Sequence, residues 1–274
     1  MEEPKLVACD VDGTLLGAGG RASSRTVAAV ARVVAAGVPF VLVTGRPPRW
    51  IPPVVDELGH AGLAVCANGA VLYDAERDRV LAASTLDPVL LRDVADALDK
   101  ALPGCTLAVE RTGETALSSE REFLAELDYA HPWPSPQSQH APRDQLFGQP
   151  AVKLLVRHAE MASEAMAEAA TAAVGDSVAV TFSTSNGLIE LSCPGVTKGS
   201  GLAEVASRLG VRAEDVVAFG DMPNDLPMLT WAGRSWAMAD AHPAVREAAG
   251  AVAPDCDEDG VAQVLEGLFG LPPG

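Results

Sequence analysis

Along the first 83 positions, continuous runs of apolar residues alternate with segments in which apolar residues recur at helical spacing. Short continuous apolar runs are typical of strands buried on both faces of a parallel sheet. Between two such runs, apolar side chains recur at helical spacing, with a serine to cap the first turn and Gly37 to end the helix. The pattern predicts, in chain order, a strand at 5–9, a helix at 23–37, a strand at 38–45, a short helix at 51–59, and a strand with an Asn-Gly turn at 63–74.

The last third of the chain repeats this alternation. It predicts helices at 198–210, 223–233, 242–250 and 257–269, and strands at 215–221, 235–240 and 251–254. Because strands and helices alternate in both parts, we expect a doubly wound, Rossmann-like α/β core built on a parallel sheet.

The middle of the chain has a different pattern. Its predicted strands, at 105–111, 151–158 and 177–184, alternate apolar and polar residues, as strands with one solvated face do. Helices are predicted at 87–102 and 160–174, and residues 131–144, rich in Pro, Ser and Gln, are predicted to form a mobile surface loop. We therefore expect an α+β domain at 84–187, inserted into an α/β core domain formed by residues 1–83 and 188–274.

Composition and charge narrow the range of partners. With 274 residues, 48% of them hydrophobic, the chain can bury a sizeable core. A formal net charge of −17 argues against nucleic acid and requires a locally positive site for any anionic ligand. No apolar run reaches the roughly 18 residues of a membrane span. The N-terminus has no signal-peptide pattern, and the five cysteines are scattered, so we expect free thiols and a cytoplasmic protein.

Candidate chemistry is concentrated where the predicted strands end. Ligands of an open parallel sheet bind at the carboxyl ends of its strands. Carboxylates without histidines favour a hard cation, Mg²⁺ before Zn²⁺, and a hydroxyl and a lysine beside them favour a bound anion. Such a set suits phosphoryl transfer, with a carboxylate as nucleophile. The polar segments at these ends are residues 10–14, 44–46, 198–199 and 220–225.

Each segment also has a simpler reading. Residues 10–14 resemble a calcium loop, but an EF-hand needs glycine at its sixth position and glutamate at its twelfth. Here Gly13 is fourth and Arg21 is twelfth, which argues against calcium. The other simple readings are a local hydroxyl contact for Thr44, a solvated first-turn lysine for Lys198, and a helix cap for Asn224 and Asp225. The joint placement of all four segments at strand ends favours one shared site.

The same four segments resemble the motifs of a known superfamily. "DVDGTLL", "VLVTGR", "GVTKGSGL" and "AFGDMPNDLPML" are similar to the four motifs of the haloacid dehalogenase-like superfamily. Within it, the chain resembles the Cof-type sugar-phosphatase group, which carries a large inserted α+β cap of type IIB. The resemblance covers about residues 5–83 and 188–268, and it implies an α/β core with an inserted cap domain.

The resemblance also implies a role for each motif residue. Asp10 is the nucleophile that forms an aspartyl-phosphate, and Asp12 first protonates the leaving alcohol and then activates water. Mg²⁺ is held by Asp10, by the backbone carbonyl of Asp12 and by Asp221, with support from Asp225. The phosphoryl oxygens are held by the amides of Val11 and Gly45 and by the side chains of Thr44, Lys198 and Asn224.

Physical chemistry is consistent with two different roles for the paired aspartates. Asp10 must be ionised to attack, whereas Asp12 must carry a proton at that step. We expect metal contact at Asp10 and desolvation at Asp12 to separate their proton affinities. Gly13 allows a sharp turn beneath the phosphate. Cys9 stands where an aromatic or aliphatic residue is common in the superfamily that the chain resembles, and we expect it to be buried and inert.

Several further residues have two readings. Arg46 either approaches the substrate or the cap, or pairs with a core carboxylate. Asn68 either faces the site or only forms its turn. Three further residues have two readings: they either contact the leaving group, or serve only in packing or in the mobile loop. They are Trp50, His131 and Trp133.

The predicted function is that of a Mg²⁺-dependent phosphatase acting on a small phosphorylated metabolite, a sugar or polyol phosphate. Two alternatives stay open at this point: a phosphomutase of the same superfamily, and a phosphate-binding regulator without turnover. The residues that select the substrate lie in the cap, which matches no motif, and the sequence makes no prediction of oligomeric state.

Overall fold

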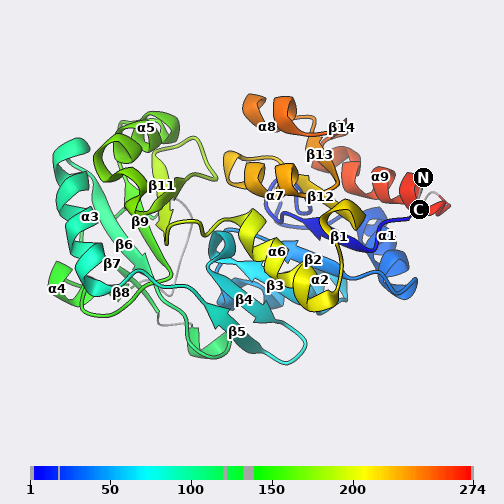
Figure 1. Cartoon of the computed structure of the whole chain (residues 1–274), viewed down its shortest axis with the longest axis horizontal. Helices are drawn as coiled ribbons and strands as arrows, with labels where there is room; N and C mark the ends of the chain where they lie inside the picture. Colours follow the sequence, from blue (N-terminus) through cyan, green and yellow to red (C-terminus); the bar gives the residue numbers. More distant parts are fainter. Residues whose placement is uncertain (1–2, 18, 120–121, 132–138, 273–274) are drawn as a thin grey trace.

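Two β-sheets organise the computed structural model, which describes residues 3–17, 19–119, 122–131 and 139–272 (Figure 1). The larger sheet has eight strands in the order β14-β13-β12-β1-β2-β3-β4-β5. It is parallel from β14 to β3 and antiparallel at β4 and β5. Its strands are β1 (Leu6–Cys9), β2 (Phe40–Val43), β3 (Leu63–Cys66), β4 (Val71–Asp74), β5 (Arg79–Ala83), β12 (Val216–Gly220), β13 (Arg234–Met238) and β14 (Ala251–Ala253).

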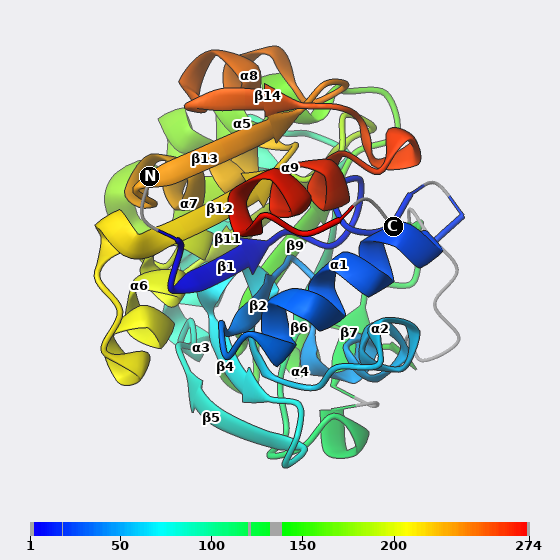
Figure 2. The same ribbon diagram turned by 90° about the vertical axis from the view of Figure 1, so that its right-hand side faces the viewer.

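Helices cover both faces of this sheet (Figure 2). One group packs together as α1 with α2 and α9, and the other as α6 with α7 and α7 with α8. The bounds are α1 (Ser24–Ala35), α2 (Pro52–Leu58), α6 (Lys198–Leu209), α7 (Leu226–Trp231), α8 (Pro243–Ala248) and α9 (Gly260–Phe269), with 3₁₀ turns η1 (Pro48–Trp50), η2 (Ala67–Gly69), η5 (Ala213–Asp215), η6 (Pro223–Asp225) and η7 (Cys256–Glu258). The predicted doubly wound α/β core is confirmed.

Strand β1 lies between β2 and β12, where the order of the strands reverses. Such a switch point opens a crevice outside the carboxyl ends of the strands. All four residues of β1 are buried, as are those of β2 and β12, so the polar residues that follow these strands are the first to leave the apolar core. Cys9, as expected, is fully buried, and burial raises the pKa of its thiol, which keeps it protonated.

The second sheet has six strands in the order β10-β11-β9-β6-β7-β8, and it lies beside the core in Figure 1. Its long helices α3 and α5 pack against each other, on the side of the sheet away from the core (Figure 1). The predicted inserted α+β unit is therefore present. Its elements are β6 (Thr106–Glu110), β7 (Phe123–Ala125), β8 (Gln139–His140), β9 (Lys153–Arg157), β10 (Ala179–Thr181), β11 (Leu188–Ser192), α3 (Pro88–Ala101), α4 (Arg143–Leu146), α5 (Ser163–Val174), η3 (Leu117–Ser119) and η4 (Gly175–Ser177).

This sheet extends past the boundary expected at residue 187. Strand β11 pairs antiparallel with β9 and β10, so the second sheet continues to Ser192. The five residues of β11 are all buried, and no strand was predicted at these positions from the sequence. Half of the predicted loop at 131–144 lies outside the described residues, and the part that is described contains β8 and the start of α4.

The alternating strands of the second sheet do not have the solvated face that the sequence pattern suggested. Their odd and even positions point to opposite faces. One face packs under α3 and α5, as Leu154 and Val156 of β9 do. The other face carries Glu110, Lys153 and Glu190, which are at most 4% exposed. They are hidden because this face of the sheet is turned toward the α/β core.

None of the helices within the described part of the chain is both long and apolar enough to cross a membrane.

Candidate active site

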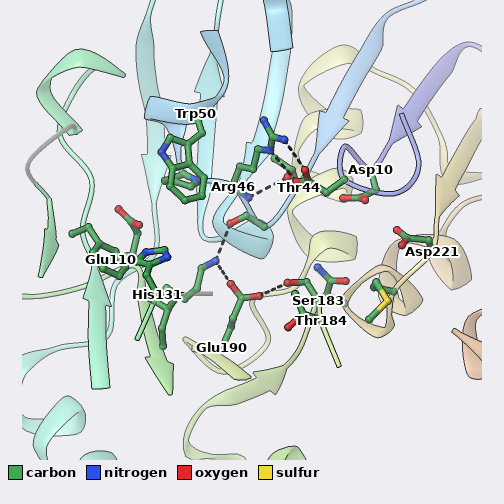
Figure 3. A pocket seen from close by; sticks show the side chains of 18 residues that line it. Asp10, Thr44, Arg46, Trp50, Glu110, His131, Ser183, Thr184, Glu190 and Asp221 are labelled. Carbon is green, nitrogen blue, oxygen red and sulfur yellow. Dashed lines mark hydrogen bonds and ion pairs between the residues drawn. The ribbon is translucent and has the colours of Figure 1, made fainter. Parts of the chain in front are cut away.

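A cavity of about 460 Å³ lies between the two sheets (Figure 3). Its walls come from the residues that follow β1, β2 and β12 on one side and from β6, β9 and β11 on the other. Asp10 and Asp221 lie at one end of the cavity, and Trp50 and His131 lie at the opposite end (Figure 3). The cavity therefore joins the predicted catalytic residues to the inserted domain.

The loop after β1 is fixed by backbone hydrogen bonds. The Asp10 amide donates to the carbonyl of Phe219 in β12 at 3.0 Å, and the Val11 carbonyl accepts from the amides of Leu15 and Leu16. Gly13 has a φ of +85°, and a Cβ there would lie 2.6 Å from Oδ2 of Asp221. Glycine is thus required both by the turn, as predicted, and by the close approach of the Asp221 carboxylate.

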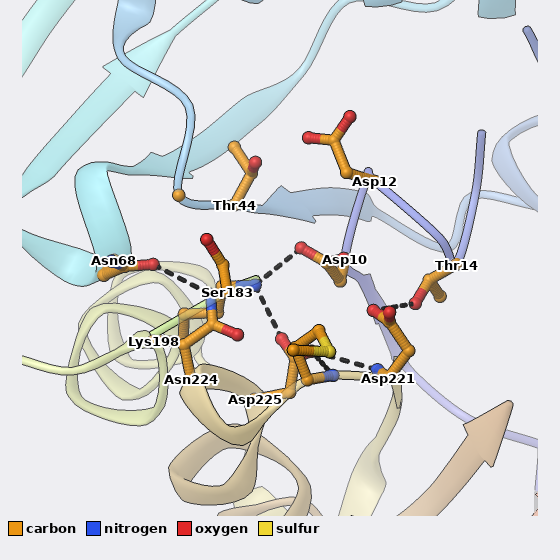
Figure 4. A network of polar contacts seen from close by, with 12 residues as sticks. Asp10, Asp12, Thr14, Thr44, Asn68, Ser183, Lys198, Asp221, Asn224 and Asp225 are labelled. Carbon is orange, nitrogen blue, oxygen red and sulfur yellow. Dashed lines mark hydrogen bonds and ion pairs between the residues drawn. The ribbon is translucent and has the colours of Figure 1, made fainter. Parts of the chain in front are cut away.

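Lys198 lies at the centre of a buried charge cluster (Figure 4). Its Nζ donates to Oδ1 of Asp10 at 2.5 Å and to Oδ1 of Asp225 at 2.6 Å, and its side chain is 1% exposed. A capping box between Thr197 and Ser200 begins α6 at this point and sets the direction of the lysine. The simpler reading of Lys198 as a solvated lysine is wrong, because the helix begins against the carboxyl end of the sheet.

Three carboxylates converge around this lysine. Asp10, Asp221 and Asp225 each place an oxygen within 4.8 Å of the others. Burial raises the pKa of Asp10 to about 7, although Lys198 acts in the opposite direction. Burial and the neighbouring Asp10 and Asp225 raise the pKa of Asp221 to about 9. One lysine does not neutralise three buried acids, so this oxygen-only set fits a hard divalent cation.

Within this cluster, Asp225 plays a supporting part. Its Oδ2 accepts from the backbone amides of Asp221 and Met222, each at 3.0 Å, and its Oδ1 accepts from Lys198. The carboxylate of Asp221 by contrast accepts only from the Thr14 hydroxyl, at 3.1 Å, among the hydrogen bonds of the described residues. The carboxylate of Asp225 therefore orients Lys198 and the Asp221 loop, while Asp10 and Asp221 have oxygens that face the cavity.

Asp12 occupies a different environment from the one expected. Its side chain is 62% exposed, so the predicted desolvation of Asp12 is wrong for this arrangement. The chain turns away from the core after β1, which leaves the carboxylate at the cavity mouth. There Arg46 binds it in a bidentate pair, with Nε 2.8 Å from Oδ2 and Nη2 2.5 Å from Oδ1. Arg46 thus follows the reading in which it pairs with a core carboxylate.

The turn after β2 lines the cavity beside Asp10. Thr44 is 1% exposed, and its Oγ1 accepts from the Arg46 amide at 3.1 Å. This is the local contact that the sequence allowed, and it leaves the hydroxyl proton for another acceptor. The carbonyl of Gly45 accepts from Lys153 of β9 at 2.8 Å. The inserted domain therefore contacts the turn that carries two of the predicted phosphate ligands.

A buried polar network connects the two domains at this point. Glu190 of β11 accepts from Lys153 at 2.5 Å and from Asn68 at 3.0 Å. Asn68 in turn accepts from Asn224 at 3.1 Å, and the Oδ1 of Asn224 has no partner among the described residues. Burial alone would raise the pKa of Glu190, but Lys153 and the other donors bring it below its usual range. Asn68 forms its turn, with a φ of 56°, and also faces the site.

Sequence reasoning missed the residues of this network in the inserted domain. Lys153 and Glu190 are charged residues inside otherwise apolar strands, and each sits two positions from a buried leucine on the same face. That pattern places them on one face, but it does not reveal what covers the face.

A second buried ion pair joins the domains at the far end of the cavity. Arg49 of η1 binds both oxygens of Glu110 in β6, and the two side chains are 1% and 5% exposed. Burial raises the pKa of Glu110 despite this partner. The guanidinium lies 5.0 Å from the ring centre of Trp50 and 5.9 Å from that of Phe123. His131 also lines the cavity, 4.9 Å from Phe123, whereas Trp133 lies outside the described residues.

Comparisons with known proteins identify the family and the fold. The model of the haloacid dehalogenase-like hydrolase family matches residues 7–265. The phosphoglycolate phosphatase of Halorubrum lacusprofundi is 29% identical over 96% of this chain and 96% of its own. The 5-amino-6-(5-phospho-D-ribitylamino)uracil phosphatase YbjI of Escherichia coli is 26% identical over 96% of this chain and 95% of its own. The solved structure of the HAD subclass IIB sugar phosphatase BT4131 shares the fold, with a TM-score of 0.79 at 19% identity over 98% and 100% of the two chains.

Proposed function

Because the chain belongs to the haloacid dehalogenase-like hydrolases, we propose that it is a phosphatase that uses Mg²⁺ to hydrolyse small phosphate monoesters, sugar or polyol phosphates in particular. The broader class, a hydrolase of phosphate monoesters, follows from the family and from two relatives that carry phosphatase names. The observation that carries the proposal is the convergence of Asp10, Asp221 and Asp225 at one end of the cavity, where the buried Lys198 binds Asp10 and Asp225.

Asp10 is the nucleophile in this proposal. Its carboxylate attacks phosphorus, the ester oxygen leaves, and an aspartyl-phosphate forms on the carboxylate oxygen. Water then attacks the phosphorus and releases inorganic phosphate, which restores the carboxylate. Lys198 and Asp225 fix the orientation of Asp10 through the contacts at 2.5 and 2.6 Å.

Mg²⁺, when bound, would offset the repulsion between the acids and neutralise negative charge on the phosphoryl oxygens. Asp10, Asp221 and the backbone carbonyl of Asp12 would hold it, with Asp225 supporting the Asp221 loop through its amide contacts. Burial and the neighbouring carboxylates raise the pKa values of Asp10 and Asp221, and a bound cation would act against this shift.

Asp12 acts as the general acid and base. To protonate the leaving oxygen it must carry a proton at that step, and in this structure both of its carboxylate oxygens are occupied by Arg46. In the proposed cycle, Arg46 therefore moves from Asp12 toward the substrate when the ester binds. The exposed position of Asp12 at the cavity mouth allows both this exchange and access of water.

The phosphoryl oxygens are held by groups at the carboxyl ends of β1, β2 and β12. The Thr44 hydroxyl retains a free proton, and the amides of Val11 and Gly45 belong to the same two strand-end turns. Lys198 and Asn224 complete the set. The unpartnered Oδ1 of Asn224 is consistent with an amide whose contacts are completed, or exchanged, when a ligand binds.

The test is a panel of phosphomonoesters assayed for inorganic phosphate with and without Mg²⁺. Release that depends on Mg²⁺, is lost on chelation and returns on readdition supports the proposal. Asp10→Asn should abolish turnover in a folded protein, and substantial residual activity would contradict the nucleophile assignment. Transfer of the phosphoryl group between sugars without release of phosphate would indicate a phosphomutase, and ligand binding without any turnover would indicate a regulator.

A further inference from the structure

The end of the cavity farthest from Asp10 differs in chemistry from the phosphate end. We propose that this far end is a subsite for a flat, uncharged ring, and that Trp50 selects substrates whose alcohol carries such a ring. The inference rests on the proposed function, because it concerns the leaving group of the same reaction.

Aromatic and apolar side chains line most of the far end, together with the carboxylate of Glu110, which is bound by Arg49. Trp50, Phe123, His131 and Leu155 all border the cavity. Three of them form a continuous cluster, because the Arg49 guanidinium bridges Trp50 and Phe123 and the ring of His131 is tilted against Phe123. Aromatic rings favour stacked or edge contacts with other rings over contacts with small hydroxylated chains.

This cluster is held in place before any ligand binds. Arg49 is pinned by its bidentate contact with Glu110, and its side chain is 1% exposed. The guanidinium in turn supports Trp50 from 5.0 Å. A surface fixed in this way loses little conformational entropy on binding, which favours affinity for a rigid planar partner.

Among the described residues, the lysine and the arginine that line the cavity are both paired before a substrate binds. Lys153 is bound to Glu190 and to the Gly45 carbonyl. Arg46 is bound to Asp12, and in the proposed cycle it is released toward the substrate only when the ester binds. The chain as a whole has a formal charge of −17. An anionic leaving group would therefore be repelled or would have to break an existing pair.

The cavity is large enough for a leaving group that carries a ring. Its volume of about 460 Å³ falls in the range of roughly 300–1,000 Å³ that is usual for small-molecule sites. The phosphate end takes up only the part beside Asp10, and Trp50 and His131 lie across the cavity from it (Figure 3). A leaving group must extend across the cavity to reach them.

Two matched pairs of substrates test this inference. Uridine 5′-monophosphate and ribose 5-phosphate differ by a neutral ring, and 2-hydroxyethyl phosphate and phosphoglycolate differ by a carboxylate. We expect kcat/KM to be at least about tenfold higher for the ring-bearing member of the first pair, in the lower part of the range for base stacking on an aromatic residue. In the second pair, the uncharged member should be preferred.

The variant Trp50→Ala should bring the first ratio close to one, and Trp50→Phe should restore part of it. Trp231→Ala is the matched control, because it removes the same side chain from α7, outside the cavity lining, and should leave the ratio unchanged. The ratio of two substrates on one protein separates selection from a general loss of folded enzyme. In the Asp10→Asn background, calorimetry should show the same preference in binding alone.

The possible failures are distinguishable. If ribose 5-phosphate is turned over as well as its ring-bearing counterpart and Trp50→Ala leaves the ratio unchanged, the ring subsite is wrong while the phosphatase proposal stands. A preference for phosphoglycolate over 2-hydroxyethyl phosphate would overturn the inference in the same way. If the wild-type protein with Mg²⁺ hydrolyses no ester of the panel, the proposed function fails and the subsite fails with it.

Discussion

Replacing Arg49 by methionine would leave Glu110 buried between the two domains without its partner. The two side chains are 1% and 5% exposed, and Glu110 also borders the cavity, so water could replace only part of the contacts that the guanidinium makes. Removing one half of a buried pair typically destabilises a protein by about 3–5 kcal/mol. The protein can limit this cost in one way, because Glu110 can take up a proton and become neutral.

Protonation sets an upper bound on the electrostatic part of the cost. Each pH unit above the ordinary pKa of 4.5 adds about 1.36 kcal/mol to the price of protonating the carboxyl. The bound is therefore about 0.7 kcal/mol at pH 5 and about 4.8 kcal/mol at pH 8. The pKa of Glu110 in the folded variant lies above its unfolded value, so the variant loses stability as pH rises through this range.

The complementary variant should behave differently. Glu110→Gln leaves Arg49 buried and charged, and a guanidinium does not lose its proton at these pH values. Its cost should therefore be large and nearly independent of pH. The double variant Arg49→Met, Glu110→Gln removes both charges and should recover most of the lost stability. Arg208→Met, which breaks an exposed pair with Glu204, is the control and should change little.

Urea unfolding at pH 5 and pH 8, followed by circular dichroism, measures these differences. The reasoning predicts that the gap between wild type and Arg49→Met widens from pH 5 to pH 8, by at most about 4 kcal/mol. Equal destabilisation at both pH values would show that lost packing on Trp50, and not the stranded carboxylate, dominates. A double variant no more stable than either single one would refute the argument altogether.

Three further outcomes are expected. Without metal, the melting temperature of the wild type should fall as pH rises through about 7, because the pKa of Asp10 is raised from 3.8 to about 7. Calorimetry with EDTA present should show a weaker dependence of melting temperature on pH for Asp10→Asn. Lys153→Met should lower kcat by about 10- to 100-fold, because it frees the Gly45 turn. The variant should keep the circular dichroism spectrum of a folded protein, and Lys153→Arg should restore part of the activity. An unchanged kcat would show that the contact between Lys153 and Gly45 does not affect turnover. Gly13→Ala should weaken the thermal stabilisation by Mg²⁺, because its Cβ would meet Asp221 at 2.6 Å, and an unaltered Mg²⁺ titration would contradict this.

The sequence predicted the α/β core and the meeting of its polar strand ends. Apolar runs of four or five residues identify buried parallel strands, and side chains that follow such strands meet at one edge of the sheet. Asp10, Thr44 and Asp221 could be grouped in this way because the rule depends only on local burial and on the order of strands. The raised pKa of Asp10 follows from the same burial.

The inserted domain was much less predictable. Alternation in β6 and β9 was correctly assigned to strands, but the polar face was expected to meet water. The tertiary structure places that face against the core, where Lys153 contacts Gly45 and Glu110 contacts Arg49. A period of two shows that these residues share a face, and nothing local specifies the neighbour.

The paired aspartates show the same division most clearly. Their spacing after a buried strand was enough to mark them as a chemical site. Only the folded chain decides that Asp10 is buried beside Lys198 while Asp12 is 62% exposed and held by Arg46. Burial and partners of a side chain depend on segments that are distant in sequence, whereas the period and polarity of a segment are written in the segment itself.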